Sequence, residues 1–186
     1  MTDAFFDTVQ SWTGNPLVDE LMVLIATYLI LVIPLSLVVL WLAGYRQPSF
    51  TIFVITILSI AIAQLLGLGF YHEPPHLQGY ETILENDPEN AFPSNHAAAI
   101  FGFAAGTVVV RYRRFAAVAT IVAIMIGVAR VYTGLHFPVD IAGGAAAALI
   151  AGVVLLSLQP YVEALAAIAI EIDDRLRETI GLPPAE

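Results

Sequence analysis

Long apolar runs separated by short polar segments make up most of this chain. A helix that crosses about 30 Å of hydrocarbon needs about 20 mostly apolar residues, and five runs meet or approach that length. The predicted spans cover residues 21–43, 51–70, 94–110, 115–131 and 138–158. Pro34 predicts a kink in the first span. The pattern therefore predicts an all-α fold, a transmembrane helix bundle that forms a single domain over residues 1–186.

The two ends of the chain predict amphipathic helices that lie along the membrane surface, over residues 3–13 and 161–180. In the first helix, three apolar side chains share one face: Phe5, Val9 and Trp12. The second follows Pro160 and carries an apolar stripe opposite a charged face. The stripe consists of Leu165, Ile168, Ile172, Leu176 and Ile180.

Composition agrees with the membrane class. The chain is 59% hydrophobic and only 12% charged, whereas soluble domains carry about 25% charged residues. Its net charge of −9 argues against a nucleic-acid partner. It has no cysteine, so it offers no thiolate metal site, and all seven of its basic residues are arginines.

The arginines predict the orientation in the membrane. Alternating spans put six of the seven on one side, which the positive-inside rule makes cytoplasmic together with the C-terminus. These six are Arg46, Arg111, Arg113, Arg114, Arg175 and Arg177. The exception is Arg130, at the outer end of the fourth span. A charge placed against the topology rule, near membrane depth, is a candidate functional residue.

Two segments on that outer side carry candidate chemistry. "ARVYTGLHFPVD" contains Arg130, His136 and Asp140, and "AFPSNH" contains Ser94, Asn95 and His96 just before the third span. An arginine grips phosphate oxygens, and a helix start favours an anion. A histidine held by a carboxylate is a nitrogen nucleophile, and a second histidine can exchange protons. These residue types suit phosphoryl transfer without a metal.

"PSNH" and Arg130-x5-His136-x3-Asp140 resemble the second and third signature motifs of the type 2 phosphatidic acid phosphatase and haloperoxidase superfamily. The likeness covers residues 18–159 and is strongest to the bacitracin-resistance type of undecaprenyl diphosphatase. It implies a membrane lipid phosphatase, with five to six spans and no cofactor. His136 would form a phosphohistidine oriented by Asp140, and His96 would be the acid and base. Arg130, Ser94 and Asn95 would bind phosphate, although Asn95 stands where many members have glycine or aspartate.

The resemblance implies a lipid phosphate or diphosphate as substrate, with a polyprenyl diphosphate favoured and phosphatidate or phosphatidylglycerol phosphate as the alternatives. The lipid bilayer is the other expected partner. The site would open on the extracytoplasmic face of a multi-pass cell-membrane protein. A channel or transporter would instead place ionisable residues near the middle of its spans, and here they gather at the ends.

The family's first motif, a lysine followed seven residues later by arginine and proline, is missing. The chain has no lysine, and no arginine lies between Arg46 and Arg111, so "YHEPPH" occupies the corresponding stretch. Three interpretations stay open. His72 or His76 binds substrate as the missing donor when protonated at lower pH; Arg130, a serine hydroxyl and backbone amides suffice at reduced affinity; or the chain is a degenerate member that binds lipid phosphate without efficient turnover.

The same stretch contains a literal H-E-x-x-H, from His72 through Glu73 to His76. In zinc peptidases this motif works because a helix brings its two histidines to one face. Here Pro74 and Pro75 fill the intervening positions, and prolines there are incompatible with helical geometry. We therefore expect neither a peptidase nor a metal site.

Overall fold

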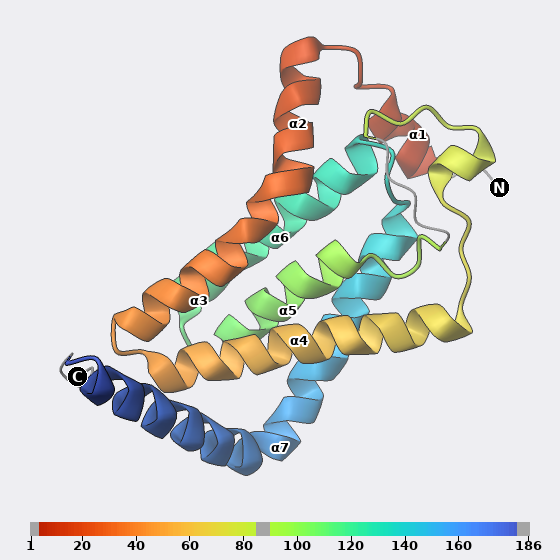
Figure 1. The fold of residues 1–186 in the computed structure, drawn as a ribbon. Coiled ribbons are helices and arrows are strands. Elements are labelled where there is room, and N and C mark those ends of the chain that lie inside the picture. The colour runs from red at the N-terminus through yellow and green to blue at the C-terminus, as the bar shows by residue number, and fades with distance from the viewer. Residues whose placement is uncertain (1–3, 85–89, 182–186) are drawn as a thin grey trace.

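The computed structural model describes residues 4–84 and 90–181, and all regular secondary structure within these ranges is helical. This confirms the predicted all-α class (Figure 1). The elements in chain order are α1 (Ala4–Gln10), α2 (Pro16–Tyr28), the 3₁₀ turn η1 (Leu29–Leu31), α3 (Val32–Leu42), α4 (Arg46–Gly69), the 3₁₀ turn η2 (Pro75–Gln78), α5 (Asn95–Val109), α6 (Arg113–Tyr132) and α7 (Pro138–Thr179).

Four helical segments of the described chain are long and apolar enough to cross a membrane: Pro16–Leu42, Arg46–Gly69, Arg113–Tyr132 and Pro138–Thr179. The first consists of α2, η1 and α3 in sequence. Pro34 lies at the start of α3, where its missing N–H would otherwise bond the carbonyl of Ile30. The α-helix is interrupted one turn earlier, at η1, which is where the expected kink falls.

The shorter apolar helix, α5, forms the centre of the bundle. It packs against α4, α6 and α7, and most of its residues are buried. The contact with α4 depends on glycine, because a Cβ at Gly102 would lie 2.7 Å from the Cβ of Ser59. A Cβ at Gly106 would lie 2.9 Å from the Cα of Ile52. Small residues at this face therefore let the two backbones approach closely.

α7 differs from the prediction. We expected a span ending near residue 158 and a separate surface helix after Pro160, but one helix of 42 residues continues through the proline. A proline removes one backbone hydrogen bond and bends a helix without necessarily ending it. Figure 1 shows the resulting change of direction in the lower part of α7. Beyond the bend, Val162 and Ala166 are buried against the bundle.

Ion pairs hold the distal part of α7 to the turn between α3 and α4. Arg46 Nη1 lies 2.7 Å from Asp174 Oδ1 and 3.4 Å from Asp173 Oδ2. The indole nitrogen of Trp41 donates to Asp173 Oδ2 at 3.1 Å, and Arg177 Nε donates to the same oxygen at 2.9 Å. The C-terminal end of α7 therefore lies beside the α3–α4 turn, as Figure 1 shows.

Of the helix expected over residues 3–13, residue 3 lies outside the described residues, and α1 ends at Gln10. α1 turns Phe6 and Val9 into a cluster with Val131, Tyr132 and Phe137. Two of the residues expected to lie together, Phe5 and Trp12, are 58% and 61% exposed. α1 thus packs on the end of α6 and on the segment that leads into α7.

Candidate active site

The start of α5 is joined to the start of α7. Ser94 is the N-cap of α5, and its hydroxyl accepts a hydrogen bond from the backbone N–H of Ala97 at 3.4 Å. Its own N–H donates to the backbone carbonyl of Asp140 at 3.0 Å. Ser94 is fully buried, whereas Asn95, the first residue of the helix, is exposed. Both predicted anion-binding residues therefore stand at a helix start, where unpaired N–H groups favour negative charge.

Glycines of α7 make this junction possible. A Cβ at Gly144 would lie 2.7 Å from the backbone nitrogen of Ala98 and 2.8 Å from the carbonyl oxygen of Ser94. A Cβ at Gly143 would clash with the ring of Phe92. Neither contact is sterically possible for a side chain, so only glycine allows α7 to lie against the first turn of α5.

Arg130 and His136 face each other within one tight connection. Arg130 lies in the last turn of α6, and the connection to α7 turns at Gly134, whose φ is +76°. The backbone carbonyl of Arg130 accepts a hydrogen bond from the N–H of Leu135 at 3.1 Å. This turn places Arg130 Nη2 3.2 Å from His136 Nε2, with both side chains buried. Arg130 Nη1 also donates to the carbonyl of Ala26 in α2 at 3.4 Å.

The contact determines the tautomer of His136. A guanidinium has donors and no acceptor, so Nε2 must present its lone pair and any proton of the neutral ring is on Nδ1. Burial lowers the pKa of His136, and the charge of Arg130 acts in the same direction, while the carboxylate of Asp140 opposes them. The ring is therefore neutral near pH 7, with an unprotonated Nε2 that faces Arg130.

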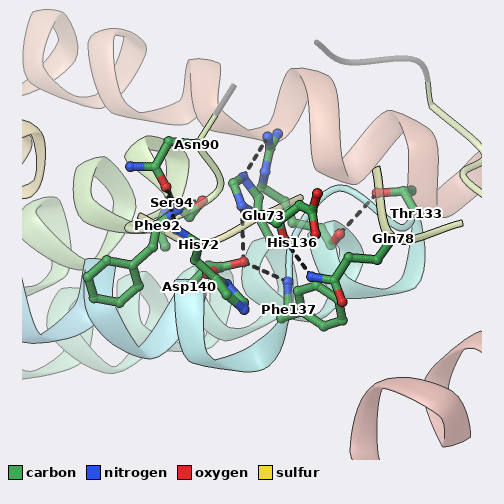
Figure 2. Close-up of polar contacts among 12 residues, drawn as sticks. His72, Glu73, Gln78, Asn90, Phe92, Ser94, Thr133, His136, Phe137 and Asp140 are labelled. Atoms are coloured by element: carbon green, nitrogen blue, oxygen red, sulfur yellow. Dashed lines mark hydrogen bonds and ion pairs between the residues drawn. The ribbon is translucent and has the colours of Figure 1, made fainter. Parts of the chain in front are cut away.

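Asp140 is fully buried, and its carboxylate lies close to two histidines, His72 and His136. One oxygen, Oδ1, lies 2.7 Å from His72 Nδ1, and the other, Oδ2, accepts the backbone N–H of Phe137 at 2.8 Å. His136 Nδ1 lies 3.7 Å from Oδ2, which is longer than a hydrogen bond. Figure 2 shows the carboxylate between these groups. Within the described ranges, His136 Nδ1 and Arg130 Nε are the buried side-chain polar atoms without a hydrogen-bond partner.

His96 completes the group of predicted residues. It is the second residue of α5, is partly buried, and lies within electrostatic range of both Arg130 and His136. The structure thus brings together the three candidate catalytic residues and Arg130, from α5, α6, α7 and the connection before α7. This is the convergence that the two sequence segments predicted.

The structure places the two histidines of "YHEPPH" in different segments. His72 lies in the irregular segment after α4 and contacts Asp140, whereas His76 belongs to η2. None of the hydrogen bonds or ion pairs of Asp140 within residues 4–84 and 90–181 includes His76. Residues 71–74 are not helical, so the spacing of H-E-x-x-H does not produce the helical pair of ligands that zinc peptidases use.

Asn90 is a site residue that sequence reasoning missed. Its Oδ1 accepts the backbone N–H groups of His72 at 2.9 Å and Phe92 at 3.0 Å. Its Nδ2 donates to the carbonyls of Gly67 at 3.0 Å and Phe70 at 2.9 Å. One carboxamide therefore joins the end of α4, the His72 segment and the approach to α5. Figure 2 shows Asn90 beside His72 and Phe92. Only the bond from the N–H of Phe92 is local, and the other three partners are backbone groups 18 to 23 residues away, which the local sequence does not indicate.

Comparison with known proteins agrees with this geometry. Residues 48–164 match the family model described as PAP2 superfamily. The chain belongs to the PAP2 superfamily. It is 34% identical over 140 residues to the putative undecaprenyl-diphosphatase YbjG of Escherichia coli, covering 73% of this chain and 70% of that protein. It is 27% identical over 157 residues to the undecaprenyl-diphosphatase BcrC of Bacillus subtilis, covering 80% and 81%.

The fold of this PAP2 protein has also been seen in a crystal structure. LpxE of Aquifex aeolicus superposes with a TM-score of 0.70 at 23% identity, covering 82% of this chain and 93% of that chain. Family and apolar helices together make this chain a multi-pass membrane phosphatase, a hydrolase that acts on a lipid phosphate.

Proposed function

We propose that this PAP2 phosphatase hydrolyses a polyprenyl diphosphate, without a metal ion, through a phosphohistidine intermediate on His136. The names of two similar proteins, YbjG and BcrC, support the substrate class. The observation that carries the chemistry is the 3.2 Å contact between Arg130 Nη2 and His136 Nε2. A phosphate oxygen bound to this guanidinium would bring the phosphorus atom next to the nitrogen lone pair.

In the proposed first step, His136 Nε2 attacks the terminal phosphorus and the bond to the leaving phosphate oxygen breaks. His96 donates a proton to that oxygen. In the second step, His96 takes a proton from water, which attacks the phosphorus and releases inorganic phosphate from His136. Asp140 stabilises the positive charge that the ring of His136 acquires in the intermediate, and Arg130 stabilises charge on the phosphoryl oxygens.

The contact between His72 and Asp140 favours the first of the three interpretations of the missing motif. His72 brings a donor into the site from the segment where family members carry lysine and arginine. We propose His72, rather than His76, as the residue that supplies this donor. Ser94 and Asn95 would add the amides and polar groups of the α5 start to phosphate binding.

We further propose five membrane spans, formed by the α2–η1–α3 segment, α4, α5, α6 and the part of α7 before its bend. Arg46 and Arg111 lie at one end of the bundle, since the adjacent rings of Tyr45 and Tyr112 are 5.9 Å apart. The positive-inside rule makes that end cytoplasmic and puts the catalytic group on the extracytoplasmic side. The distal part of α7, held by Arg46, would lie along the cytoplasmic surface.

The decisive experiment is phosphate release by purified protein from a panel of lipids: a polyprenyl diphosphate, phosphatidate and phosphatidylglycerol phosphate. We expect the diphosphate to have the highest kcat/KM. A substrate labelled in the terminal phosphate should leave acid-labile, base-stable label on wild-type protein after rapid quenching, and none on His136→Ala. Label that persists on His136→Ala would contradict the assigned nucleophile, and a higher kcat/KM for phosphatidate would contradict the substrate.

A further inference from the structure

A hollow of about 600 Å³ lies at the end of the bundle opposite the catalytic group, where α5 connects to α6. It is lined by Val108, Arg111, Arg113 and Ala116, and we name it the arginine hollow. Two guanidinium groups thus share a concave surface with two apolar side chains. Val108 is 59% exposed, so the apolar part of the hollow is open at the surface.

No acidic side chain in the described part of the chain is paired with the two arginines of the hollow. Among the described residues, neither Arg111 nor Arg113 makes a side-chain hydrogen bond or an ion pair, although the chain has a net charge of −9. Three acidic side chains of distal α7, Glu171, Asp173 and Asp174, are paired with other arginines instead. These arginines are Arg46, Arg175 and Arg177. Unpaired positive charge in an acidic protein indicates an anionic partner from outside the chain.

The backbone at Arg111 gives a second, independent observation. Its φ is +63°, and it is the one non-glycine residue in the described ranges with positive φ. The residue closes α5, because the N–H of the next residue, Tyr112, bonds the carbonyl of Thr107 at 3.1 Å. Glycine is preferred at such a position, since a side chain is strained there. The chain instead keeps an arginine whose side chain lines the hollow.

We propose that the arginine hollow binds the headgroup of an anionic phospholipid from the leaflet on the side opposite the catalytic group. Guanidinium groups bind phosphate diesters with paired N–H donors, and basic pockets at the membrane surface hold anionic lipids. Val108 and Ala116 provide apolar contact for the glycerol and first methylenes of such a lipid. The neighbouring rings of Tyr45 and Tyr112 are the kind of side chains that stand at headgroup depth.

The test compares two arginines that differ in whether they line the hollow. Arg113→Gln removes a residue that lines the hollow, whereas Arg114→Gln removes the same charge from the next position, which is also exposed but does not line the hollow. The purified full chain in mild detergent is titrated with phosphatidylglycerol and with phosphatidylcholine of identical acyl chains, and bound lipid is counted by native mass spectrometry. Both variants remove one charge from the first turn of α6, so a general effect of charge or topology cancels in the comparison.

We expect wild-type protein to prefer phosphatidylglycerol by at least about ten-fold, as two arginines near an anionic surface imply. Arg113→Gln should weaken phosphatidylglycerol binding by roughly five-fold, and combination with Arg111→Asn, which tolerates positive φ, by about thirty-fold. Arg114→Gln should change phosphatidylglycerol binding by less than about two-fold. No variant should change the binding of phosphatidylcholine by more than about two-fold. Arg113→Lys keeps the charge without the paired donors and should fall between wild type and Arg113→Gln.

Three results would overturn the proposal. Equal losses in Arg113→Gln and Arg114→Gln would mean that the cluster acts only as diffuse surface charge. No preference of the wild-type protein for phosphatidylglycerol would mean that the hollow is not a lipid site. Displacement of phosphatidylglycerol by millimolar inorganic phosphate would identify a site for a soluble anion. A thermal unfolding scan of each variant shows whether it is folded, and Arg113→Lys serves as the test if Arg113→Gln is not.

Discussion

His72 Nδ1 lies 2.7 Å from Asp140 Oδ1, although the two residues are 68 positions apart in the chain. Asp140 is fully buried, and a buried carboxylate is stable only where donors satisfy it. Among residues 4–84 and 90–181, His72 and the backbone N–H of Phe137 are the groups that hydrogen-bond this carboxylate. His72, from the stretch that stands in place of the family's first motif, therefore contacts the carboxylate that we propose to orient His136.

The first prediction concerns this contact. His72→Ala leaves one oxygen of Asp140 without its donor, and loss of a hydrogen bond to a charged group costs about 2 kcal/mol. We expect kcat/KM to fall roughly thirty-fold. His76→Ala, from the same "YHEPPH" stretch, is the matched control and should reduce kcat/KM by less than about three-fold. A larger loss of kcat/KM in His76→Ala than in His72→Ala would show that His76, and not His72, supplies the donor that the missing first motif would have provided.

Asn90 gives the second prediction, because its carboxamide holds the backbone of His72. Asn90→Ala removes four hydrogen bonds and should lower the free energy of unfolding by roughly 2–4 kcal/mol. If Asn90 positions His72, Asn90→Ala should also lower kcat/KM. The decrease should be smaller in a protein that already carries His72→Ala. The double-mutant cycle measures this coupling. If the effects of Asn90→Ala and His72→Ala on kcat/KM were additive, Asn90 would not act through His72 and its role would be structural only.

The sequence alone predicted those features of the structure that depend on the local order of residue types. Apolar run length predicted the helices, and the misplaced Arg130 with its spacing to His136 and Asp140 predicted the residues that converge. The same pattern could not show that α7 continues through Pro160, because buried contacts of Val162 and Ala166 beyond the bend compensate for one lost hydrogen bond. Such compensation depends on tertiary packing.

Contacts made through the backbone were equally hidden. Asn90 bonds four main-chain groups. Because main-chain groups are the same in nearly every residue type, the sequence does not show which of them a side chain will bond. Similarly, α1 buries Phe6 rather than Phe5 because the rings of Tyr80 and Phe137 lie 4.9 and 4.7 Å from that of Phe6. Helical periodicity alone makes both phenylalanines plausible members of the buried face.

A third prediction follows from the lowered pKa of His136. Burial keeps the folded ring neutral below its ordinary pKa of about 6.5, whereas the unfolded chain takes up a proton there. The unfolded state then binds more protons, so the contribution of His136 to the free energy of unfolding decreases as pH falls below about 6.5. The charged or titratable groups around the ring are Arg130, Asp140, His72 and His96.

The measurement is the thermal midpoint between pH 8 and pH 5 for wild type and for His136→Gln, which cannot titrate. The difference between the two proteins isolates His136 from the other histidines. We expect the wild-type midpoint to fall more steeply than that of His136→Gln on the acid side of about pH 6.5. Parallel curves would mean that His136 titrates alike in the folded and unfolded chain, and that its ring is not kept neutral by the site.

The last prediction tests the junction of α5 and α7 with two glycines of the same helix. Gly144→Ala puts a methyl group 2.7 Å from the backbone nitrogen of Ala98 and 2.8 Å from the carbonyl oxygen of Ser94, and backbone atoms cannot move aside cheaply. α7 must therefore shift away from the start of α5. Overpacking of this kind costs about 1–3 kcal/mol. The shift also stretches the 3.0 Å bond from the N–H of Ser94 to the carbonyl of Asp140, so activity should fall with stability.

Gly152→Ala, eight residues further along α7, is the matched control. Its new methyl group would meet only the Cβ of Ala105, at an ordinary 3.8 Å, and alanine favours the helix by up to about 1 kcal/mol. We expect the thermal midpoint and kcat/KM of Gly152→Ala to equal or exceed those of wild type, while both fall in Gly144→Ala. If Gly144→Ala kept wild-type stability and activity, α7 would not need its close approach to α5, and the positions of Ser94 and Asp140 would not depend on it.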